Sequence, residues 1–483
     1  MPVDLLKTLN EEFGFTDFRP GQLEVLTKLQ QGDDVFAILP TGGGKTLIYQ
    51  LFGRVNSGTV VVVSPLISLM QDQVQRMQYL GEKRVVALTS NLSFSEKQIV
   101  LNNISQYKYI YISPEMLSNQ NVLEHFKQLE ISLFVVDEAH CVSEWGPDFR
   151  PEYQDLGWIR TRLNSPLTLM ITATATDKVQ QDVISKLGFE NGEVDIESQP
   201  VNRPNIFLAA KVVADEKEKL AVVKQFLSTI SGKGIIYFSS RVKAEKIAEQ
   251  LAASANLKVL AYHGGMTSED RYSVQQQFMN DQIDVICATS AFGMGIDKQD
   301  IRFVIHFHIP ANLQSYMQEI GRCGRDGEKG VALALFSDDD RFIHLGLLDK
   351  TIPTSNEIEY AYAHPDVEFN DESYRVIKYY IGHQVPLNEV QQIFEKRKIQ
   401  RQVELAQMID YIMSTTCRRE KLLTPFQSTY ESEPGFCCDI DDEFWIDVQT
   451  FMDEHSINSQ KVSADEQSED WLSVVNQLFL SKN

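Results

Sequence analysis

The chain has 483 residues and a formal net charge of −22, from 45 basic and 67 acidic side chains. This length predicts about three domains, and no apolar run approaches the ~20 residues that a bilayer-spanning helix needs, so we expect no membrane association. The start, Met1-Pro2-Val3-Asp4, lacks a basic region followed by an apolar stretch. We therefore expect a cytoplasmic protein. Six cysteines in so long a chain do not indicate a disulfide framework.

The acidic excess is uneven along the chain. Residues 430–483 hold thirteen Asp and Glu against Lys461 and Lys482, a net of −11, which leaves −11 for the other 429 residues. Any contact with nucleic acid must therefore come from a local groove, and added salt should weaken it. The acidic tail is expected to be a solvated segment or a docking helix for a protein partner, because like charge repels phosphate.

Short apolar runs alternate with helix-forming stretches in two series, which predicts two parallel sheets with crossover helices. A linker with two prolines, residues 199–205, separates the series. The strands of the first series are expected at 35–39, 60–63, 109–112, 133–136 and 167–171, and those of the second at 234–238, 259–262, 285–288, 303–306 and 331–336.

Beyond residue 336 the sequence becomes polar and helix-forming. Leu405, Met408, Ile409 and Ile412 recur at the spacing of one helix face. The pattern predicts an α/β domain over 1–200, a second over 201–340, a small helical subdomain over 341–440 and an acidic tail over 441–483.

A glycine-rich turn follows the first predicted strand and reads Leu39-Pro40-Thr41-Gly42-Gly43-Gly44-Lys45-Thr46. Its backbone N–H groups can surround phosphate, Lys45 can reach the β and γ phosphates, and the Thr46 hydroxyl can ligate magnesium. The usual pattern has glycine where this chain has Leu39. A strand-to-helix turn without chemistry therefore remains the alternative for this loop taken alone.

A second apolar strand ends in Asp137-Glu138-Ala139-His140, 92 residues after Lys45. Asp137 is expected to hold the magnesium, and Glu138 is expected to orient the attacking water. The two motifs in this order predict hydrolysis of a nucleoside triphosphate.

The acidic quartet runs directly into CVSEWGPDFRPEY at residues 141–153, which resembles the aromatic-rich loop of RecQ-family DNA helicases. Further strings resemble motifs of the same family. They are FGFTDFRPGQ at 13–22, TATA at 172–175, CATSAFGMGID at 287–297 and QEIGRCGRDG at 318–327. The resemblance covers about residues 5–440.

This resemblance implies two tandem RecA-like domains followed by the helical subdomain. It also implies ATP and Mg²⁺ as cofactors, and 3′ to 5′ translocation on single-stranded DNA with duplex unwinding in repair and recombination. Single-stranded and forked DNA would be the partners. The implied ATP-site residues are Arg19, Gln22, Thr41, Gly42, Gly43, Gly44, Lys45, Thr46, Asp137, Glu138, His140, Gly295, Asp297, Gln318, Arg322 and Arg325.

Residue chemistry supports several of these assignments. Gln22 offers the donor and the acceptor that an adenine edge needs, and Arg19 can stack or pair nearby. Arg322 and Arg325 can meet the γ-phosphate from across a cleft, although a surface salt bridge is the usual fate of arginine.

DNA contacts are expected at four residues. Trp145 and Phe149 can stack on bases and Arg150 can pair with phosphate, whereas the alternative is that both aromatics belong to the core. Ser64 offers a hydroxyl at a strand end, where serine is also an ordinary turn former.

A zinc site is an open question in this sequence. RecQ proteins commonly hold zinc with four cysteines, whereas the matching positions here offer Cys417, Cys437, Cys438 and a carboxylate, Asp441. A metal-free helical platform is the alternative.

Only 42 residues follow Asp441, too few for the winged-helix and C-terminal helical DNA-binding modules that many relatives append. One alternative function is therefore a DNA-stimulated ATPase or translocase without strand separation. A second alternative is an RNA helicase, against which the aromatic string argues. We expect the protein to be a monomer.

Overall fold

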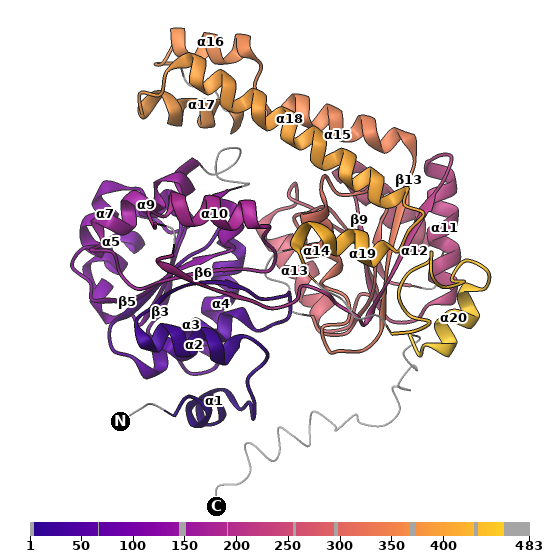
Figure 1. Cartoon of the computed structure of the whole chain (residues 1–483), viewed down its shortest axis with the longest axis horizontal. Helices are drawn as coiled ribbons and strands as arrows, with labels where there is room; N and C mark the ends of the chain where they lie inside the picture. The colour runs from indigo at the N-terminus through magenta and orange to yellow at the C-terminus, as the bar shows by residue number, and fades with distance from the viewer. Residues whose placement is uncertain are drawn as a thin grey trace, which may run out of the picture.

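Two parallel β-sheets dominate the computed structural model, which describes residues 4–65, 67–143, 151–190, 192–254, 257–293, 298–367, 372–428 and 433–457. Figure 1 shows them side by side, with a helical extension lying above both. We call the first sheet and its helices lobe 1 (residues 4–198) and the second sheet and its helices lobe 2 (residues 206–336).

The sheet of lobe 1 has the strand order β3-β4-β2-β5-β6-β1-β7, and every neighbouring pair is parallel. Its strands are β1 (Asp34–Ile38), β2 (Thr59–Val63), β3 (Val85–Leu88), β4 (Tyr109–Ile112), β5 (Ile131–Asp137), β6 (Thr168–Thr172) and β7 (Val194–Ser198). Along β2, Val60 and Val62 join one buried cluster while Val61 and Val63 join another. Both faces of the sheet are therefore covered, as parallel sheets require.

The sheet of lobe 2 has the order β10-β11-β9-β12-β13-β8 and is also parallel throughout. Its strands are β8 (Ile206–Val212), β9 (Lys233–Tyr237), β10 (Val259–Tyr262), β11 (Val285–Ala288), β12 (Ile301–His306) and β13 (Gly330–Phe336). Each predicted strand of both series is present, and the predicted α/β fold with two tandem parallel sheets is confirmed.

Helices connect the strands as crossovers. In lobe 1, α1 (Leu5–Phe13) and α2 (Gln22–Gln31) precede the first strand. The connecting helices are α3 (Lys45–Val55), α4 (Ile67–Tyr79), α5 (Phe94–Asn102), α6 (Pro114–Leu117), α7 (Gln120–Phe126), α9 (Leu156–Arg162) and α10 (Asp177–Lys186), with short 3₁₀ turns η1 (Ile104–Gln106), η2 (Ala139–Val142) and η3 (Pro151–Asp155). Those of lobe 2 are α11 (Glu216–Thr229), α12 (Arg241–Ser254), α13 (Ser268–Met279) and α14 (Leu313–Ile320).

The helical extension, which we call the arm, comprises α15 (Asp338–Thr351), α16 (Ser355–Ala363), α17 (Glu372–Gly382) and α18 (Leu387–Ile412). The predicted apolar face of α18 is present, because Leu405, Met408 and Ile412 are buried. In Figure 1 the arm starts above lobe 2 and reaches over lobe 1. Among the described residues, no helix is long and apolar enough to cross a membrane.

The chain then returns to lobe 2 through α19 (Arg418–Leu423), η4 (Thr424–Phe426) and α20 (Val448–Glu454). Phe444 and Phe451 stack on Phe207 of β8 with ring centroids 4.9 and 4.5 Å apart. Residues 441–457, which the sequence assigns to the acidic tail, are thus packed against lobe 2, because aromatic side chains are interspersed among the acidic ones. Residues 458–483 lie outside the described residues.

Candidate active site

The glycine-rich turn lies between β1 and α3, at the carboxyl edge of the lobe 1 sheet. Gly42 and Gly44 have φ values of +82° and +71°, and Gly44 is the N-cap of α3. A Cβ atom on Gly44 would lie 2.4 Å from Nε2 of Gln22. The left-handed φ favours glycine here, and a side chain would also displace the Gln22 amide from the loop. Lys45 and Thr46 occupy the first turn of α3, where helix N–H groups favour an anion.

Arg19 and Gln22 hold this turn in place through hydrogen bonds to its backbone carbonyls. The Gln22 amide is 1% exposed and donates to the carbonyls of Gly43 and Gly44 at 3.0 Å each. Its Oε1 accepts from the Arg19 backbone N–H at 2.9 Å, and the Arg19 guanidinium donates to the Gly42 carbonyl. These bonds place both residues against the phosphate loop, whereas their adenine-reading role stays a prediction.

Two carboxylates face Lys45 across the loop. Burial, and then the neighbouring charge of Glu138, raises the pKa of Asp137 to about 7, while Lys45 opposes this rise. Burial lowers the pKa of Lys45, and the charges of Glu138 and Asp137 act against that shift. Glu138 adopts a left-handed conformation at φ +48°, which is uncommon for a non-glycine residue and frequent at functional sites. This pair of carboxylates would stabilise a divalent cation such as Mg²⁺.

His140 lies between Glu138 and lobe 2, because its Nδ1 is 3.5 Å from Oε2 of Glu138. Its Nδ1 lies 2.9 Å from the Thr172 hydroxyl, which itself donates to the Thr174 carbonyl. Its Nε2 lies 3.3 Å from the Gln318 amide nitrogen, a group that can only donate. His140 Nε2 therefore accepts and Nδ1 carries the proton. This neutral form agrees with a pKa lowered by burial.

Helix α14 presents two amides to lobe 1. Gln314 and Gln318 are one turn apart, and Gln314 donates to the Thr174 carbonyl at 3.3 Å. The Thr41 hydroxyl donates back to Gly321, the C-cap of α14, at 3.0 Å. The phosphate loop and the TATA segment thus both contact the same helix of lobe 2.

The two predicted arginines follow α14, and the side chain of Arg325 reaches lobe 1. A Cβ atom on Gly42 would lie 3.5 Å from Cγ of Arg325, so this side chain packs against the phosphate loop. The Arg322 guanidinium donates to the Gly293 carbonyl within lobe 2. Both positive charges act on the pKa of Lys45 and lower it. The phosphate loop of lobe 1 and Arg325 of lobe 2 therefore meet at a cleft between the lobes, which is lined by Thr41, Thr174 and Gly321 among others.

One contributor to this cleft was missed in the sequence. Arg203 in the linker donates to the carbonyls of Thr41 at 3.3 Å, Gly321 at 3.1 Å, Cys323 at 3.0 Å and Gly324 at 2.6 Å. An arginine between two prolines in an otherwise uncharged linker was the available signal.

The predicted DNA contacts are placed only in part. Ser64 follows β2 and is buried, and within the described part of the chain its hydroxyl has no hydrogen-bond partner. Trp145, Phe149 and Arg150, together with Gly295 and Asp297 of the predicted ATP site, lie outside the described residues.

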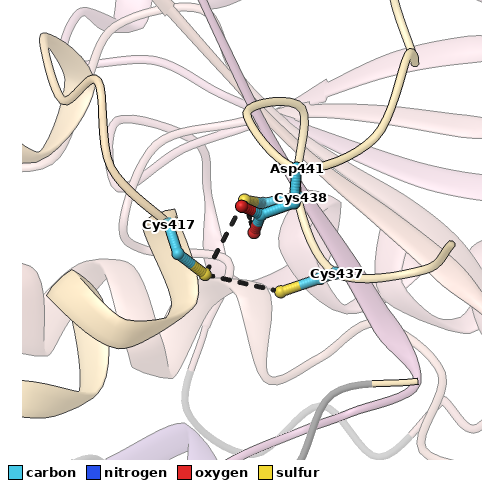
Figure 2. Close-up of side chains that lie close together, drawn as sticks. All are labelled: Cys417, Cys437, Cys438 and Asp441. Carbon is cyan, nitrogen blue, oxygen red and sulfur yellow. Dashed lines mark hydrogen bonds between the residues drawn. The ribbon is translucent and has the colours of Figure 1, made fainter. Parts of the chain in front are cut away.

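The predicted zinc ligands come together in one cluster, shown in Figure 2. The ligand atoms of Cys417, Cys437, Cys438 and Asp441 all lie within 4.8 Å of one another. The Sγ atom of Cys417 is 3.6 Å from that of Cys437 and 4.0 Å from that of Cys438. A tetrahedral ion with Zn–S bonds of about 2.3 Å places its sulfurs about 3.8 Å apart, so the donor set fits zinc.

Sequence models of known families match both lobes. The model described as DEAD/DEAH box helicase matches residues 19–183, and the helicase conserved C-terminal domain matches residues 218–327. The probable ATP-dependent DNA helicase RecS of Bacillus subtilis is 41% identical over 453 residues, which cover 90% of this chain and 91% of the relative. The chain belongs to the RecQ family of helicases. The RecQ helicase of Haemophilus influenzae is 38% identical over 73% of this chain, which spans only 57% of that relative's length.

Solved helicases share the fold of this RecQ-family chain. Mss116p bound to ssRNA and AMP-PNP aligns with a TM-score of 0.60 at 19% identity, covering 88% of this chain and 89% of that one. Lhr of Mycobacterium smegmatis bound to ssDNA and AMP-PNP aligns with a TM-score of 0.57 at 20% identity, covering 76% of this chain and 50% of that one. These likenesses support the RecA-like assignment of both lobes.

Proposed function

We propose that this RecQ-family chain is an ATP-dependent DNA helicase that hydrolyses ATP in the cleft between its lobes. One observation carries the proposal. The phosphate loop of lobe 1 contacts the arginine-bearing segment of lobe 2, because the Thr41 hydroxyl donates to the Gly321 carbonyl at 3.0 Å and the Arg325 side chain packs against Gly42. A site divided between two bodies can convert the loss of a phosphate into movement.

Each residue has a distinct role in this proposal. Lys45 and the N–H groups of the glycine-rich turn hold the β and γ phosphates, while Thr46 and Asp137 hold Mg²⁺. Glu138 orients the attacking water, and Arg322 and Arg325 stabilise the charge that develops on the γ-phosphate. Arg19 and Gln22 read the adenine after exchanging their present hydrogen bonds to the loop.

Cleavage is coupled to movement through the contacts between the lobes. His140 and Gln318 connect the carboxylates of lobe 1 to α14 of lobe 2. Loss of the γ-phosphate releases the arginines, the lobes separate, and a strand held by both is advanced 3′ to 5′. Ser64, Trp145, Phe149 and Arg150 are the proposed contacts to that strand.

An unwinding assay on forks, 3′ overhangs and 5′ overhangs with ATP and Mg²⁺ tests this function. We expect unwinding of forks and 3′ overhangs, and its loss in Glu138→Gln with ATP binding retained. ATP hydrolysis without strand separation would favour the translocase instead. Stronger stimulation of hydrolysis by RNA than by single-stranded DNA would favour an RNA helicase.

We also propose that the four-residue cluster binds zinc in a structural role, because its donor atoms have the spacing of a tetrahedral site. Bound zinc would tie α19 to the segment after residue 436. Metal analysis should find one zinc per chain. The content should fall in Cys437→Ser and Asp441→Ala and stay unchanged in Cys287→Ser and Glu443→Gln. Equal zinc in all four variants, or none in the wild type, would contradict the site.

A cytoplasmic location, a monomeric state and a protein partner for the acidic tail are parts of the same proposal. Sedimentation at several protein concentrations tests the monomer.

A further inference from the structure

The arm is firmly joined to lobe 2 at one end. Leu405, Met408, Tyr411 and Ile412 near the end of α18 are buried in the central hydrophobic cluster, which also includes residues of β8 and α14. The ring of Tyr411 lies 5.2 Å from that of Tyr316 on α14. Beyond α18, Arg419 of α19 donates to the side chain of Asn202 and the carbonyl of Arg203, at 2.9 Å each.

The other end of the arm contacts lobe 1. Arg375 of α17 pairs with Glu152 at 2.8 Å and lies 3.8 Å from Glu115. The Tyr379 hydroxyl donates to Asp155 at 2.6 Å. Nε2 of His383 lies 3.3 Å from the same Asp155 oxygen. Helix α17 therefore contacts lobe 1 at its η3 turn and at α6.

This distant contact is made by a rigid unit. Ile358, Val376, Ile377, Val390 and Phe394 form a separate buried cluster that ties α16, α17 and the start of α18 together. Helix α18 has 26 residues, which at 1.5 Å per residue span about 39 Å. A continuous helix of this length transmits position from one end to the other, so α17 moves with lobe 2.

The contact between α17 and lobe 1 is centred on partly buried carboxylates that accept from Arg375 and Tyr379. Asp155 and Glu152 are about one-fifth exposed, whereas Arg375 is about half exposed. Burial and the neighbouring Asp155 raise the pKa of Tyr379, so its hydroxyl stays protonated and donates. A hydrogen bond from a neutral donor to a carboxylate in a partly dry position is among the stronger kinds.

We propose that α17 is a brace between the lobes, and that Arg375 and Tyr379 are positioning residues for the hydrolysis of ATP. They touch neither the nucleotide loop nor the catalytic carboxylates. They act by holding lobe 1 in the arrangement in which Thr41 bonds to Gly321 and Arg325 packs on the phosphate loop. The proposal rests on the proposed function, since it assigns a means of control to that same site.

The direction of the effect follows from linkage. The contacts of α17 with lobe 1 and the contacts at the ATP site form in the same closed arrangement of the lobes. Each set of contacts therefore stabilises the other. Lobes joined at the cleft alone can rotate about it, whereas a second attachment at the end of the arm restricts that rotation. Loss of the brace therefore lowers the population of the closed cleft, and more ATP is needed to restore it.

The first experiment measures ATP hydrolysis by the full chain with saturating single-stranded DNA. We expect Tyr379→Phe and Arg375→Gln each to raise the KM for ATP, and the pair together to raise it about fivefold or more, with kcat changed by less than about twofold. Weaker binding of a non-hydrolysable ATP analogue should accompany the change. Tyr360→Phe on α16 and Lys378→Gln on α17 are matched controls and should leave both constants unchanged.

Reversing the charges of the Arg375–Glu152 ion pair distinguishes a positioning role of this contact from a general loss of stability. Arg375→Glu and Glu152→Arg should each raise the KM, and the double variant should recover part of the loss, with Glu115 limiting recovery. An unchanged KM, a lower KM with faster hydrolysis in the absence of DNA, or two single defects with no recovery would each overturn the brace. A wild-type chain that does not hydrolyse ATP would instead refute the proposed function.

Discussion

A single histidine tautomer links the hydrolytic carboxylates of this protein to its second lobe. His140 accepts from Gln318 at Nε2 because its proton is on Nδ1, which donates to the Thr172 hydroxyl; that hydroxyl in turn donates to the Thr174 carbonyl. The same carbonyl accepts from Gln314. Thr172 and Thr174 of the TATA segment therefore determine which hydrogen bonds can form between the two lobes.

This relay predicts a specific defect in Gln318→Ala. The variant should bind ATP normally, since the Gln318 amide donates to His140, but stimulation of hydrolysis by single-stranded DNA should fall at least about tenfold. Gln277→Ala is the control, because this half-buried amide of α13 donates to Ser273 of the same helix. Stimulation equal to that of the wild type would show that the His140 to Gln318 contact has no part in coupling.

Gly44 of the phosphate loop has a backbone conformation that alanine rarely adopts. Alanine there would hold a left-handed φ of +71° and place its Cβ 2.4 Å from the Gln22 amide. We expect Gly44→Ala to weaken ATP binding at least about tenfold in a calorimetric titration. Gly346→Ala in α15 has open space and should leave binding unchanged; equal affinity in both variants would contradict this reading.

Among the elements, the carboxyl end of β12 in the second sheet holds a cluster of buried basic side chains. Lys219 of α11 donates to the Phe307 carbonyl at 2.7 Å and pairs with Asp340 of α15. His308 accepts from the Ser239 backbone N–H at 3.2 Å. Burial, followed by the nearby charges of Lys219, His344 and Lys243, lowers the pKa of His308 to about 3.

This shift predicts how stability changes with pH. Because the folded state excludes a proton that the unfolded state binds below pH 6.5, the free energy of unfolding should fall as pH decreases from 6.5 toward 3. At pH 5, 1.5 units below pH 6.5, His308 should lower the free energy of unfolding by about 2 kcal/mol, at 1.36 kcal/mol per pH unit. Urea unfolding of His308→Gln at pH 7.5 and pH 5 should therefore show a smaller loss than the wild type. Identical losses would mean that His308 titrates normally.

The elements that the sequence predicts are those with continuous apolar runs. Three strands in the described part of the chain were not predicted. Edge strand β7 reads Val-Asp-Ile-Glu-Ser and has no fully buried residue, so it has no such signal. Strands β3 (Val85–Leu88) and β8 (Ile206–Val212) do carry apolar runs and were overlooked. The phosphate loop and the acidic quartet were predictable because their chemistry is local. Arg203 and α17 were not, since their partners lie more than a hundred residues away and only the folded chain brings them together.

At the scale of the whole molecule, the end of the described chain completes lobe 2. The segment from Cys437 to Asp439 pairs with β8, where Leu208 donates to the Cys437 carbonyl at 3.2 Å and accepts from Asp439 at 3.0 Å. Phe436, Phe444, Phe451, Met452 and Ile457 then extend the core of that lobe. The cysteine cluster, the arm and α20 all meet at this one edge strand.

Residues 441–457 should therefore behave as part of the fold and not as a solvated tail. Phe451 is 8% exposed and packs on Phe207, so Phe451→Ala should lower the free energy of unfolding by about 3–5 kcal/mol. Its neighbour Ile446 is 75% exposed, and Ile446→Ala should change stability by less than about 0.5 kcal/mol. Truncation after Ile457 removes none of the described contacts and should leave urea unfolding of lobe 2 unchanged, whereas truncation after Asp441 should destabilise it. Equal stability of the two truncated chains would show that residues 442–457 do not contribute to the folded core.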